Sequence, residues 1–300
     1  MEQRLKTIAK GAVLTAAGVW MSKILTYGYR SAIARFGGPE IYGQLAQAIA
    51  VLTVFGTLST LSTQRAVRTF VPRYLERGDD SKLRGTVIST ILITMPASLI
   101  STALMFILAE PLATVVFESP GVAPAIKVMA FVPPFATLSK IGISTTVGFS
   151  TVKYQVINNN IVQNLTQLGG AVVLLFAGFE LFAATGSWLF GSVITGLLAL
   201  YFMEFKVGPV LRLDAVPKMQ YRKILRFSIP LMFSNIVAAV LGYTDIVFIG
   251  HFFDDSTVGV YNAALPAAQL VSLPAAGIGS LALPSISGAR EEGKDGAHIL

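Results

Sequence analysis

The chain has 300 residues, of which 53% are hydrophobic and only 13% are charged, and it contains no cysteine. Soluble domains carry charge on about a quarter of their residues, so this composition leaves too little polar surface for a water-soluble protein. The absence of cysteine excludes disulfide frameworks, thiolate metal sites and cysteine nucleophiles. The net charge of +7 would indicate nucleic-acid binding in a soluble protein, but in a membrane protein its distribution reports topology. We therefore expect membrane lipids as neighbours and no nucleic acid.

Apolar stretches of about 20 residues recur along the chain, which is the length that a helix needs to cross a hydrocarbon core. This pattern predicts an all-α, polytopic transmembrane helix bundle. In chain order, the predicted spans are Gly11 to Phe36, Ile41 to Leu61, Val87 to Leu108, Val128 to Ser150, Ile161 to Leu181, Ala184 to Tyr201, Leu225 to Gly250, and Val258 to Leu283. Pro133 and Pro134 in the fourth span and Pro230 in the seventh predict kinks or freed backbone groups.

The connections between these spans alternate in charge. Basic residues precede the first span and follow the second, fourth, sixth and eighth, whereas acidic residues such as Glu40, Glu118 and Asp254 lie in the other connections. Because lysine and arginine concentrate in cytoplasmic connections, the pattern predicts a multi-pass protein of the cytoplasmic membrane with its N-terminus in the cytoplasm. The connection after the second span, with six basic residues from Arg65 to Arg84, is assigned to the cytoplasmic side.

The chain also matches itself when it is shifted by 216 residues without a gap. Matched pairs are Lys6 with Arg222, Lys10 with Arg226, Tyr27 with Tyr243, Ile33 with Ile249, Phe36 with Phe252, Gly43 with Gly259, and Ala66 with Ala282. We interpret residues 1–215 as an N-terminal lobe of six helices and residues 216–300 as the start of a second lobe, truncated after its first two helices. The chain is therefore expected to be part of a protein with about twelve spans or more.

Five of the 23 lysines and arginines fall outside the basic connections. They are Lys23, Arg30, Arg35, Lys127 and Lys140. A cation at the middle of a membrane costs about 3 kcal/mol on insertion scales, so it usually faces a partner or a watery cavity. One interpretation is that these side chains extend to the membrane interface, which fits Arg35 and Lys127 near helix ends. For Lys23 and Lys140 we favour a cationic cavity that binds an anionic head group, and Arg30 shares a helical face with Lys23 and Tyr27.

Amide side chains form a polar stripe at the start of the fifth span. These side chains are Asn160, Gln163, Asn164 and Gln167, whose spacing places them on one helical face. Amides there can bind a hydroxyl-rich substrate, or they can hold neighbouring helices together, which is their commoner use in membranes. Both interpretations stay open at the level of sequence.

The acidic residues offer one candidate for ion coupling. Asp245 lies within the seventh predicted span, where an isolated carboxylate is a proton or cation site by default, although an acid at the membrane interface is an equal alternative. The pair Asp254 and Asp255 belongs to a short outer connection, and we do not expect it to bind a metal. The chain has no phosphate-binding glycine loop, no histidine pair with metal spacing and no nucleophile elbow. We therefore predict no enzyme activity, no metal and no cofactor.

Two runs of residues resemble a known family. The run from Ser22 to Gly43, with Lys23, Tyr27 and Arg30 and the turn Phe36-Gly37-Gly38-Pro39-Glu40, is similar to the first helix and loop of polysaccharide flippases. The run from Ala66 to Asp79 resembles the segment after their second helix. These flippases belong to the multidrug/oligosaccharidyl-lipid/polysaccharide exporter superfamily. The resemblance implies a MATE-like fold of twelve or fourteen helices, in which two six-helix lobes surround a cavity that opens alternately to each side.

The resemblance also implies a role for the first helix. In relatives that flip a lipid-linked peptidoglycan precursor, basic residues of this helix face the cavity, and Lys23 and Arg30 match those positions. This chain differs in that lysine replaces one arginine and the spacing is one residue longer.

The function that we predict is flipping of a polyprenyl-(pyro)phosphate-linked oligosaccharide across the cytoplasmic membrane for surface polysaccharide or glycan synthesis. Polysaccharide assembly proteins are expected partners. The alternative is a cation-coupled multidrug exporter of the same superfamily. Such an exporter should have acidic residues in its cavity, but this sequence offers one acid, Asp245, against three basic residues, Lys23, Arg30 and Lys140. This balance favours an anionic substrate. A membrane-embedded glycan polymerase or transferase is a third alternative, disfavoured because the outer connections are short.

Overall fold

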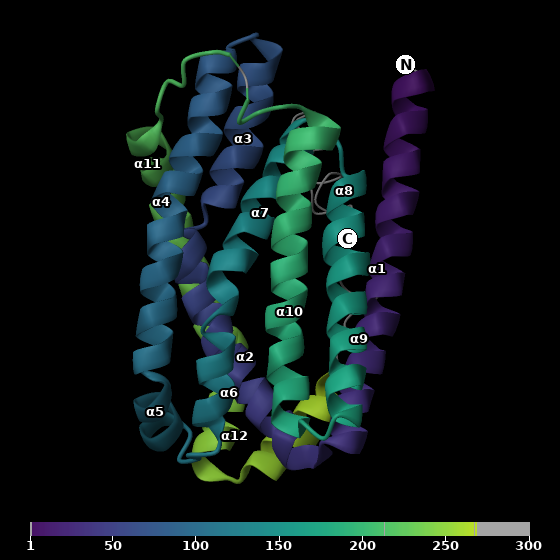
Figure 1. Ribbon diagram of the computed structural model, residues 1–300, viewed down its shortest axis with the longest axis vertical. Helices are drawn as coiled ribbons and strands as arrows, with labels where there is room; N and C mark the ends of the chain where they lie inside the picture. Colours follow the sequence, from purple (N-terminus) through teal and green to yellow (C-terminus); the bar gives the residue numbers. More distant parts are fainter. Residues whose placement is uncertain (1, 213, 267, 269–300) are drawn as a thin grey trace, which may run out of the picture. The chain divides into compact units, whose positions relative to one another are not determined.

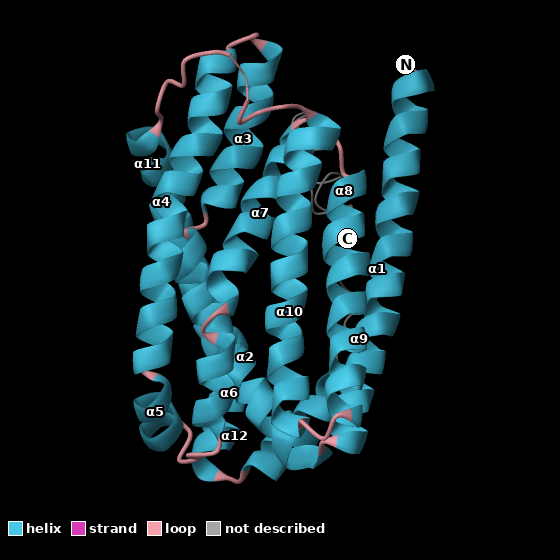
Figure 2. Ribbon diagram, viewed as in Figure 1, coloured by secondary structure: helices cyan, strands magenta, loops and turns pink. Residues whose placement is uncertain are grey.

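The computed structural model describes residues 2–212, 214–266 and 268, and this part of the chain is helical, without a β-strand (Figures 1 and 2). Contacts divide the chain into two units, Met1–Gly259 and Val260–Leu300. The first unit holds α1 (Glu2–Phe36), α2 (Gly38–Thr60), α3 (Thr63–Glu76), α4 (Asp80–Ile107), α5 (Ala109–Pro111), α6 (Val122–Met129), α7 (Val132–Gly148), α8 (Lys153–Gln155), α9 (Gln163–Phe176), α10 (Glu180–Tyr201), α11 (Tyr221–Gly242) and α12 (Thr244–Phe252). Three π-helical segments are η1 (Leu112–Val116), η2 (Val156–Val162) and η3 (Phe202–Val207). The backbone is helical again from Asp255 to Gly259, where the first unit ends. The described residues of the second unit are also helical.

Among the described residues, four helical segments are long and apolar enough to cross a membrane. They are α2, α4, α10 together with η3, and α11. A fifth span arises if α6 and α7, which meet at a bend of 41°, are counted as one. The prediction of an all-α membrane bundle is thus confirmed.

Three predicted spans are divided into separate helices, and most of the eighth, Val258 to Leu283, lies outside the described residues. The fifth predicted span runs across the turn between α9 and α10. The bend in the fourth predicted span precedes Pro133 and Pro134, which occupy the first turn of α7, where proline is tolerated because the first N–H groups of a helix have no intrahelical partner. The seventh predicted span is interrupted at Tyr243, between α11 and α12. Pro230 lies inside α11, which continues through it.

The basic segment after the second predicted span is an amphipathic helix. The chain turns sharply between α2 and α3, where Leu61 and Ser62 adopt left-handed backbone angles with φ of 47° and 56°. The buried face of α3 consists of Thr63, Ala66, Val67, Phe70, Val71 and Tyr74. Because these residues recur at helical spacing, α3 packs against α4 and α7 and carries its arginines on the remaining surface.

Tyr29 joins α1 to α10. Its hydroxyl donates a hydrogen bond to the carbonyl oxygen of Ala184 at 2.5 Å and accepts one from the indole N–H of Trp188 at 3.1 Å. Tyr29 is buried, together with Ile33 on the next turn of α1. A buried hydroxyl needs partners to offset its desolvation, so these contacts set the position of α1 in the bundle.

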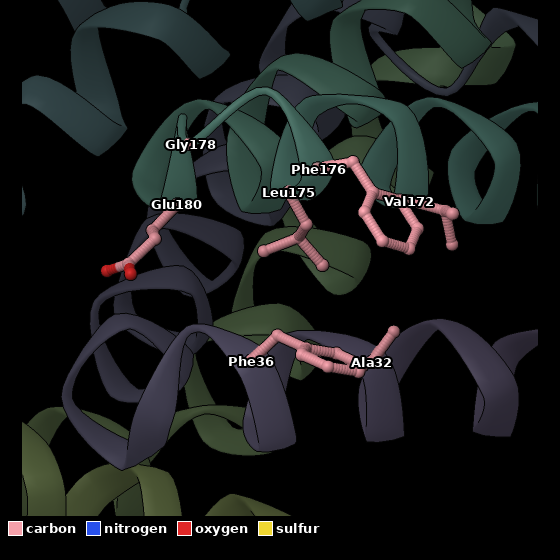
Figure 3. Close-up of a pocket in the computed structure, with 7 residues that line it drawn as sticks. All are labelled: Ala32, Phe36, Val172, Leu175, Phe176, Gly178 and Glu180. Atoms are coloured by element: carbon pink, nitrogen blue, oxygen red, sulfur yellow. The ribbon is translucent and has the colours of Figure 1, made fainter.

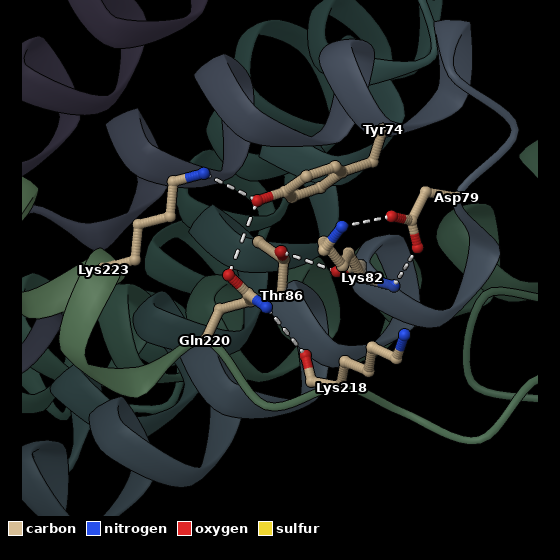
Figure 4. Close-up of polar contacts among 7 residues, drawn as sticks. All are labelled: Tyr74, Asp79, Lys82, Thr86, Lys218, Gln220 and Lys223. Carbon is tan, nitrogen blue, oxygen red and sulfur yellow. Dashed lines mark hydrogen bonds and ion pairs between the residues drawn. The ribbon is translucent and has the colours of Figure 1, made fainter.

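The connection that precedes α11 is held against the start of α4. The Arg84 guanidinium donates hydrogen bonds to the carbonyl oxygens of Ala215 at 2.8 Å and Leu211 at 2.9 Å, and the backbone N–H of Lys218 donates to the carbonyl oxygen of Ser81 at 2.9 Å. These bonds place the first turns of α11 beside α3 (Figure 4). The predicted boundary between two lobes, at residues 215 and 216, falls inside this connection and stays a prediction.

Candidate functional site

The basic face of α1 is exposed at its centre. Lys23 is exposed, Tyr27 keeps 70% of its surface accessible, and Arg30 is half-buried. The Arg30 guanidinium lies within hydrogen-bonding reach of the Tyr42 hydroxyl on α2. Lys23 has neither an ion pair nor a hydrogen bond within the described part of the chain. The three residues thus share one side of α1, and its Arg30 end meets α2.

A second basic group, which we call the α3/α7 cation pair, consists of Arg68 and Lys140. The Nε–H of Arg68 donates a hydrogen bond to the hydroxyl of Ser144 on α7 at 3.2 Å. Lys140 precedes Ser144 by four residues and therefore lies one turn away on the same face. Both basic side chains are exposed, and in the described part of the chain neither pairs with an acid. Within the described residues, α1, which carries Lys23 and Arg30, does not pack extensively against α7, which carries Lys140, and the proximity of these cations stays a prediction.

The other two basic residues predicted near helix ends differ from this pair. Lys127 forms an ion pair with Glu110 at 2.6 Å; Glu110 is exposed and Lys127 is half-buried. Arg35 is exposed in the last turn of α1. Lys127 therefore has a partner for its charge that Lys23 and Lys140 lack within the described residues.

Polar contacts surround the junction of α2 and α3. Asn235 on α11 donates from its amide to the hydroxyl of Ser62 at 2.9 Å and accepts from Arg65 at 3.2 Å. The hydroxyls of Ser59 and Thr137 lie 3.2 Å apart, which ties the end of α2 to α7. The junction thus combines hydroxyls, an amide and a guanidinium from α2, α3, α7 and α11.

The amide stripe is divided between two roles. Asn164 accepts a hydrogen bond from Thr26 and donates one to Ser22, both at 3.0 Å, so it holds α1 to α9. Gln167 is buried and its amide nitrogen has no hydrogen-bond partner in the described structure. Asn160 and Gln163 are half-buried. The contacts of Asn164 match the alternative in which amides join helices, and substrate binding by the stripe stays a prediction.

Asp245 lies in the first turn of α12, where it is half-buried and accepts a hydrogen bond from the N–H of Ile246 at 2.9 Å. The more deeply embedded acid is Asp255, with 9% of its surface exposed. Its carboxylate accepts hydrogen bonds from Gln44 at 3.0 Å, Gln47 at 2.9 Å and Ser119 at 2.7 Å. Among the described residues, no group of three or more acidic, histidine or cysteine side chains could hold a metal ion. The sequence analysis assigned Asp255 to a short outer connection. In the structure its carboxylate is instead an anchor that holds α2 and the connection at Ser119 together.

The backbone approaches closely beside Asp255, at a contact that we call the glycine crossing. A Cβ atom on Gly43 would lie 1.8 Å from the carbonyl oxygen of Asp255, and one on Gly259 would lie 2.0 Å from the carbonyl oxygen of Pro39. Pro39 and Asp255, like Gly43 and Gly259, are separated by the offset of the internal repeat. Gly43 contacts Asp255, and Gly259 contacts Pro39, which occupies the position matching Asp255 in the first copy of the repeat. Such reciprocal contacts are the pattern of a two-fold related interface. The division of the chain into two lobes stays a prediction.

Sequence reasoning missed three polar residues of this arrangement. Arg65 and Arg68 were grouped with the basic connection, although the helical spacing of the apolar residues around them could have indicated a helix. Asp255 was assigned to a loop. Gly259, which lies one helical turn after Asp255 and matches Gly43 in the internal repeat, could have indicated a close helix contact there.

The structure also contains an apolar cleft, between the end of α1 and the end of α9. It has a volume of about 170 Å³ and is lined by Ala32, Phe36, Val172, Leu175, Phe176, Gly178 and Glu180 (Figure 3). Glu180 is its one ionisable group. A cleft with a single acid and several apolar side chains does not suit an anionic or sugar-rich ligand.

Comparisons with known proteins place the chain in a family. The family model described as "Polysaccharide biosynthesis protein" matches residues 8–289. The chain belongs to this family. A search of curated protein sequences gave no match. A solved structure described as the inward-facing conformation of a multidrug resistance MATE family transporter of the MOP superfamily is similar in fold, with a TM-score of 0.51 and 19% sequence identity.

That similarity covers 93% of this chain and 62% of the transporter, so the chain spans less than two thirds of the transporter's length. The MATE-like fold predicted from the sequence is confirmed. The predicted membership of a polysaccharide biosynthesis family is confirmed as well. The protein is therefore a multi-pass membrane protein with a MATE-like fold.

Proposed function

We propose that the protein takes part in flipping a lipid-linked oligosaccharide across the cytoplasmic membrane, with the lipid carrier attached through a phosphate or pyrophosphate. The observation that supports this most strongly is the α3/α7 cation pair, whose two basic groups are exposed without an acidic partner in the described structure. The family match adds that the substrate is related to oligosaccharides.

The physical reason lies in the cost of charge at membrane depth. An unpaired cation in a hydrocarbon environment is unfavourable by about 3 kcal/mol on insertion scales. Phosphate oxygens can offset this cost, because arginine and lysine form charge-assisted hydrogen bonds with them. Lys140 and Arg68 on one side and Lys23 and Arg30 on α1 would neutralise the anionic head group. The half-buried amides of Asn160 and Gln163 would meet the sugars.

A flippase must open to each side of the membrane in turn. The cluster of Asp255 with Gln44, Gln47 and Ser119 supports one closed end in this conformation, since it joins α2 to the repeat counterpart of α2 beside the glycine crossing. The charge pattern of the connections supports assigning this end to the outer side and the N-terminus to the cytoplasm. Passage of substrate to the outside would require this cluster to separate.

The alternative function is export of cationic drugs, since the similar transporter is described as a multidrug resistance protein. Such an exporter needs an accessible acid in its cavity. Asp255 already accepts hydrogen bonds from three side chains, whereas the exposed groups of the α3/α7 cation pair, Arg68 and Lys140, are basic. The charge of the exposed groups therefore favours an anionic substrate.

The test is transport by the protein reconstituted in liposomes, with a fluorescent oligosaccharide linked to polyprenyl pyrophosphate. We expect Lys140→Gln and Arg68→Gln to slow flipping at least tenfold. The matched control is Lys127→Gln, which also removes one lysine but from an ion pair with Glu110, and it should leave flipping unchanged. Equal flipping in all variants, or efflux of a cationic dye without flipping, would contradict the proposed function.

A further inference from the structure

A basic pocket lies between α3 and α11. It is an open depression of about 690 Å³, lined by Phe70, Arg222, Lys223, Arg226 and Phe227. The two phenylalanine rings meet edge to face with their centroids 5.4 Å apart. No acidic residue lines the pocket. Its lining therefore combines three cations with an aromatic wall.

Lys223 is held toward α3 instead of extending freely into solvent. Its ammonium donates a hydrogen bond to the Tyr74 hydroxyl at 2.8 Å (Figure 4) and lies 4.5 Å from the centroid of the Phe70 ring. Arg222 and Arg226 are exposed and make no hydrogen bond or ion pair within the described residues. The pocket thus contains one fixed cation and two that are available to a ligand.

The position of these cations on α11 is electrostatically unfavourable in the absence of an anion. All three lie in the first two turns of the helix, whose first turn has no acidic residue. Unpaired backbone N–H groups give this end of a helix a partial positive charge, so that basic side chains are disfavoured and anions are favoured there. A bound anion would satisfy both the helix end and the side chains.

The surface of α11 below the pocket is apolar along one stripe. Arg222 and Arg226 share a helical face with Ile229, Phe233 and Val237, because these residues follow one another at spacings of three or four. The three apolar side chains are exposed by 39%, 60% and 58%. A cationic end that continues into an exposed apolar stripe is complementary to a lipid, with its phosphate at one end and its acyl chain along the helix.

We infer that the basic pocket binds the phosphate head group of a membrane lipid. Arg222 and Arg226 contact the phosphate oxygens, Lys223 supplies a fixed positive charge, and the acyl chain follows the apolar stripe of α11. This site does not depend on the proposed function, because an anionic glycerophospholipid and a polyprenyl pyrophosphate present the same phosphate chemistry.

The test is lipid binding by the purified full chain in neutral detergent, measured by native mass spectrometry. The probes are phosphatidylglycerol, a polyprenyl pyrophosphate, phosphatidylcholine and inorganic pyrophosphate. We expect Arg222→Gln/Arg226→Gln to weaken binding of one or both anionic lipids about 30-fold, as loss of two basic contacts predicts. The control Lys153→Gln/Lys206→Gln removes two exposed lysines outside the pocket and should bind as the wild type does.

A further variant, Tyr74→Phe, keeps every charge but releases Lys223, and a smaller loss of affinity is expected. Preference for phosphatidylglycerol would identify the ligand as a bulk membrane lipid, and preference for polyprenyl pyrophosphate would identify it as a carrier lipid; either supports the site. Equal binding of phosphatidylcholine, equal losses in the control variant, or binding of inorganic pyrophosphate without lipid would overturn it.

Discussion

The glycine crossing allows a sharp test of the packing between α2 and the helix that begins at Asp255. In Gly43→Ala, the new Cβ atom would lie 1.8 Å from the carbonyl oxygen of Asp255, whereas an ordinary contact begins at 3.4 Å. Since the obstructing atom belongs to the backbone, the two segments must separate by about 1.6 Å. Overpacking of this kind costs about 1–3 kcal/mol, and we expect the free energy of unfolding to fall by the upper part of that range.

The same helix supplies the control. Gly56 also lies in α2, but a Cβ atom there would meet nothing within 4 Å. Alanine favours a helix over glycine by about 0.5–1 kcal/mol, so Gly56→Ala should stabilise the protein slightly. Opposite signs for two identical substitutions in one helix cannot arise from helix propensity alone.

The assay is unfolding of the purified protein in mixed micelles titrated with sodium dodecyl sulfate, followed by tryptophan fluorescence. Gly259→Ala should resemble Gly43→Ala, because its Cβ atom would lie 2.0 Å from the carbonyl oxygen of Pro39. The double variant should cost less than the sum of the single variants, since one separation relieves both contacts. The reasoning is refuted if Gly43→Ala is as stable as Gly56→Ala, or if the two crossing glycines behave independently.

Three further predictions concern single polar groups. Asp255→Ala should lower the free energy of unfolding by about 1–3 kcal/mol, because its buried donors lose their acceptor; a cost below 0.5 kcal/mol in the same detergent titration would count against the anchor. Tyr29→Phe should cost about 1–3 kcal/mol for the same reason, and retention of full stability would mean that the two hydrogen bonds of its hydroxyl are not formed. Hydrogen bonds from the side chain and backbone of Lys82 hold the pKa of Asp79 below its ordinary value, so the stabilisation from Asp79 should be complete above about pH 4 and lost as the pH falls through its lowered pKa. Unfolding measured between pH 2 and pH 6 should show that loss in the wild type and a smaller one in Asp79→Asn.

Much of the fold follows from local sequence. Apolar stretches of membrane length predicted α2, α4, α10 and α11, because the length of a helix and its hydrophobicity are properties of a contiguous segment. The prolines at positions 133 and 134 likewise indicated the bend between α6 and α7. Family resemblance was also readable, since it rests on short contiguous runs around Lys23 and Arg68.

Charge alone was a less certain guide to position. The basic segment around Arg65 and Arg68 reads as a connection by its composition, yet it is the amphipathic helix α3. Composition averages over the two faces of a helix, and only periodicity separates them. The exposed arginine face of α3 and its proximity to Ser144 on α7 depend on how α3 packs.

The sequence by itself determined that the protein is a helical membrane bundle with a cationic character, since these properties are sums over local segments. Only the tertiary structure decided which polar groups meet. Gln44 and Asp255 are separated by 211 residues and form a hydrogen bond, and Lys223 reaches Tyr74 on a helix that begins 158 residues earlier in the chain. Such contacts depend on the crossing of helices, which small residues such as Gly43 permit and which no local pattern encodes.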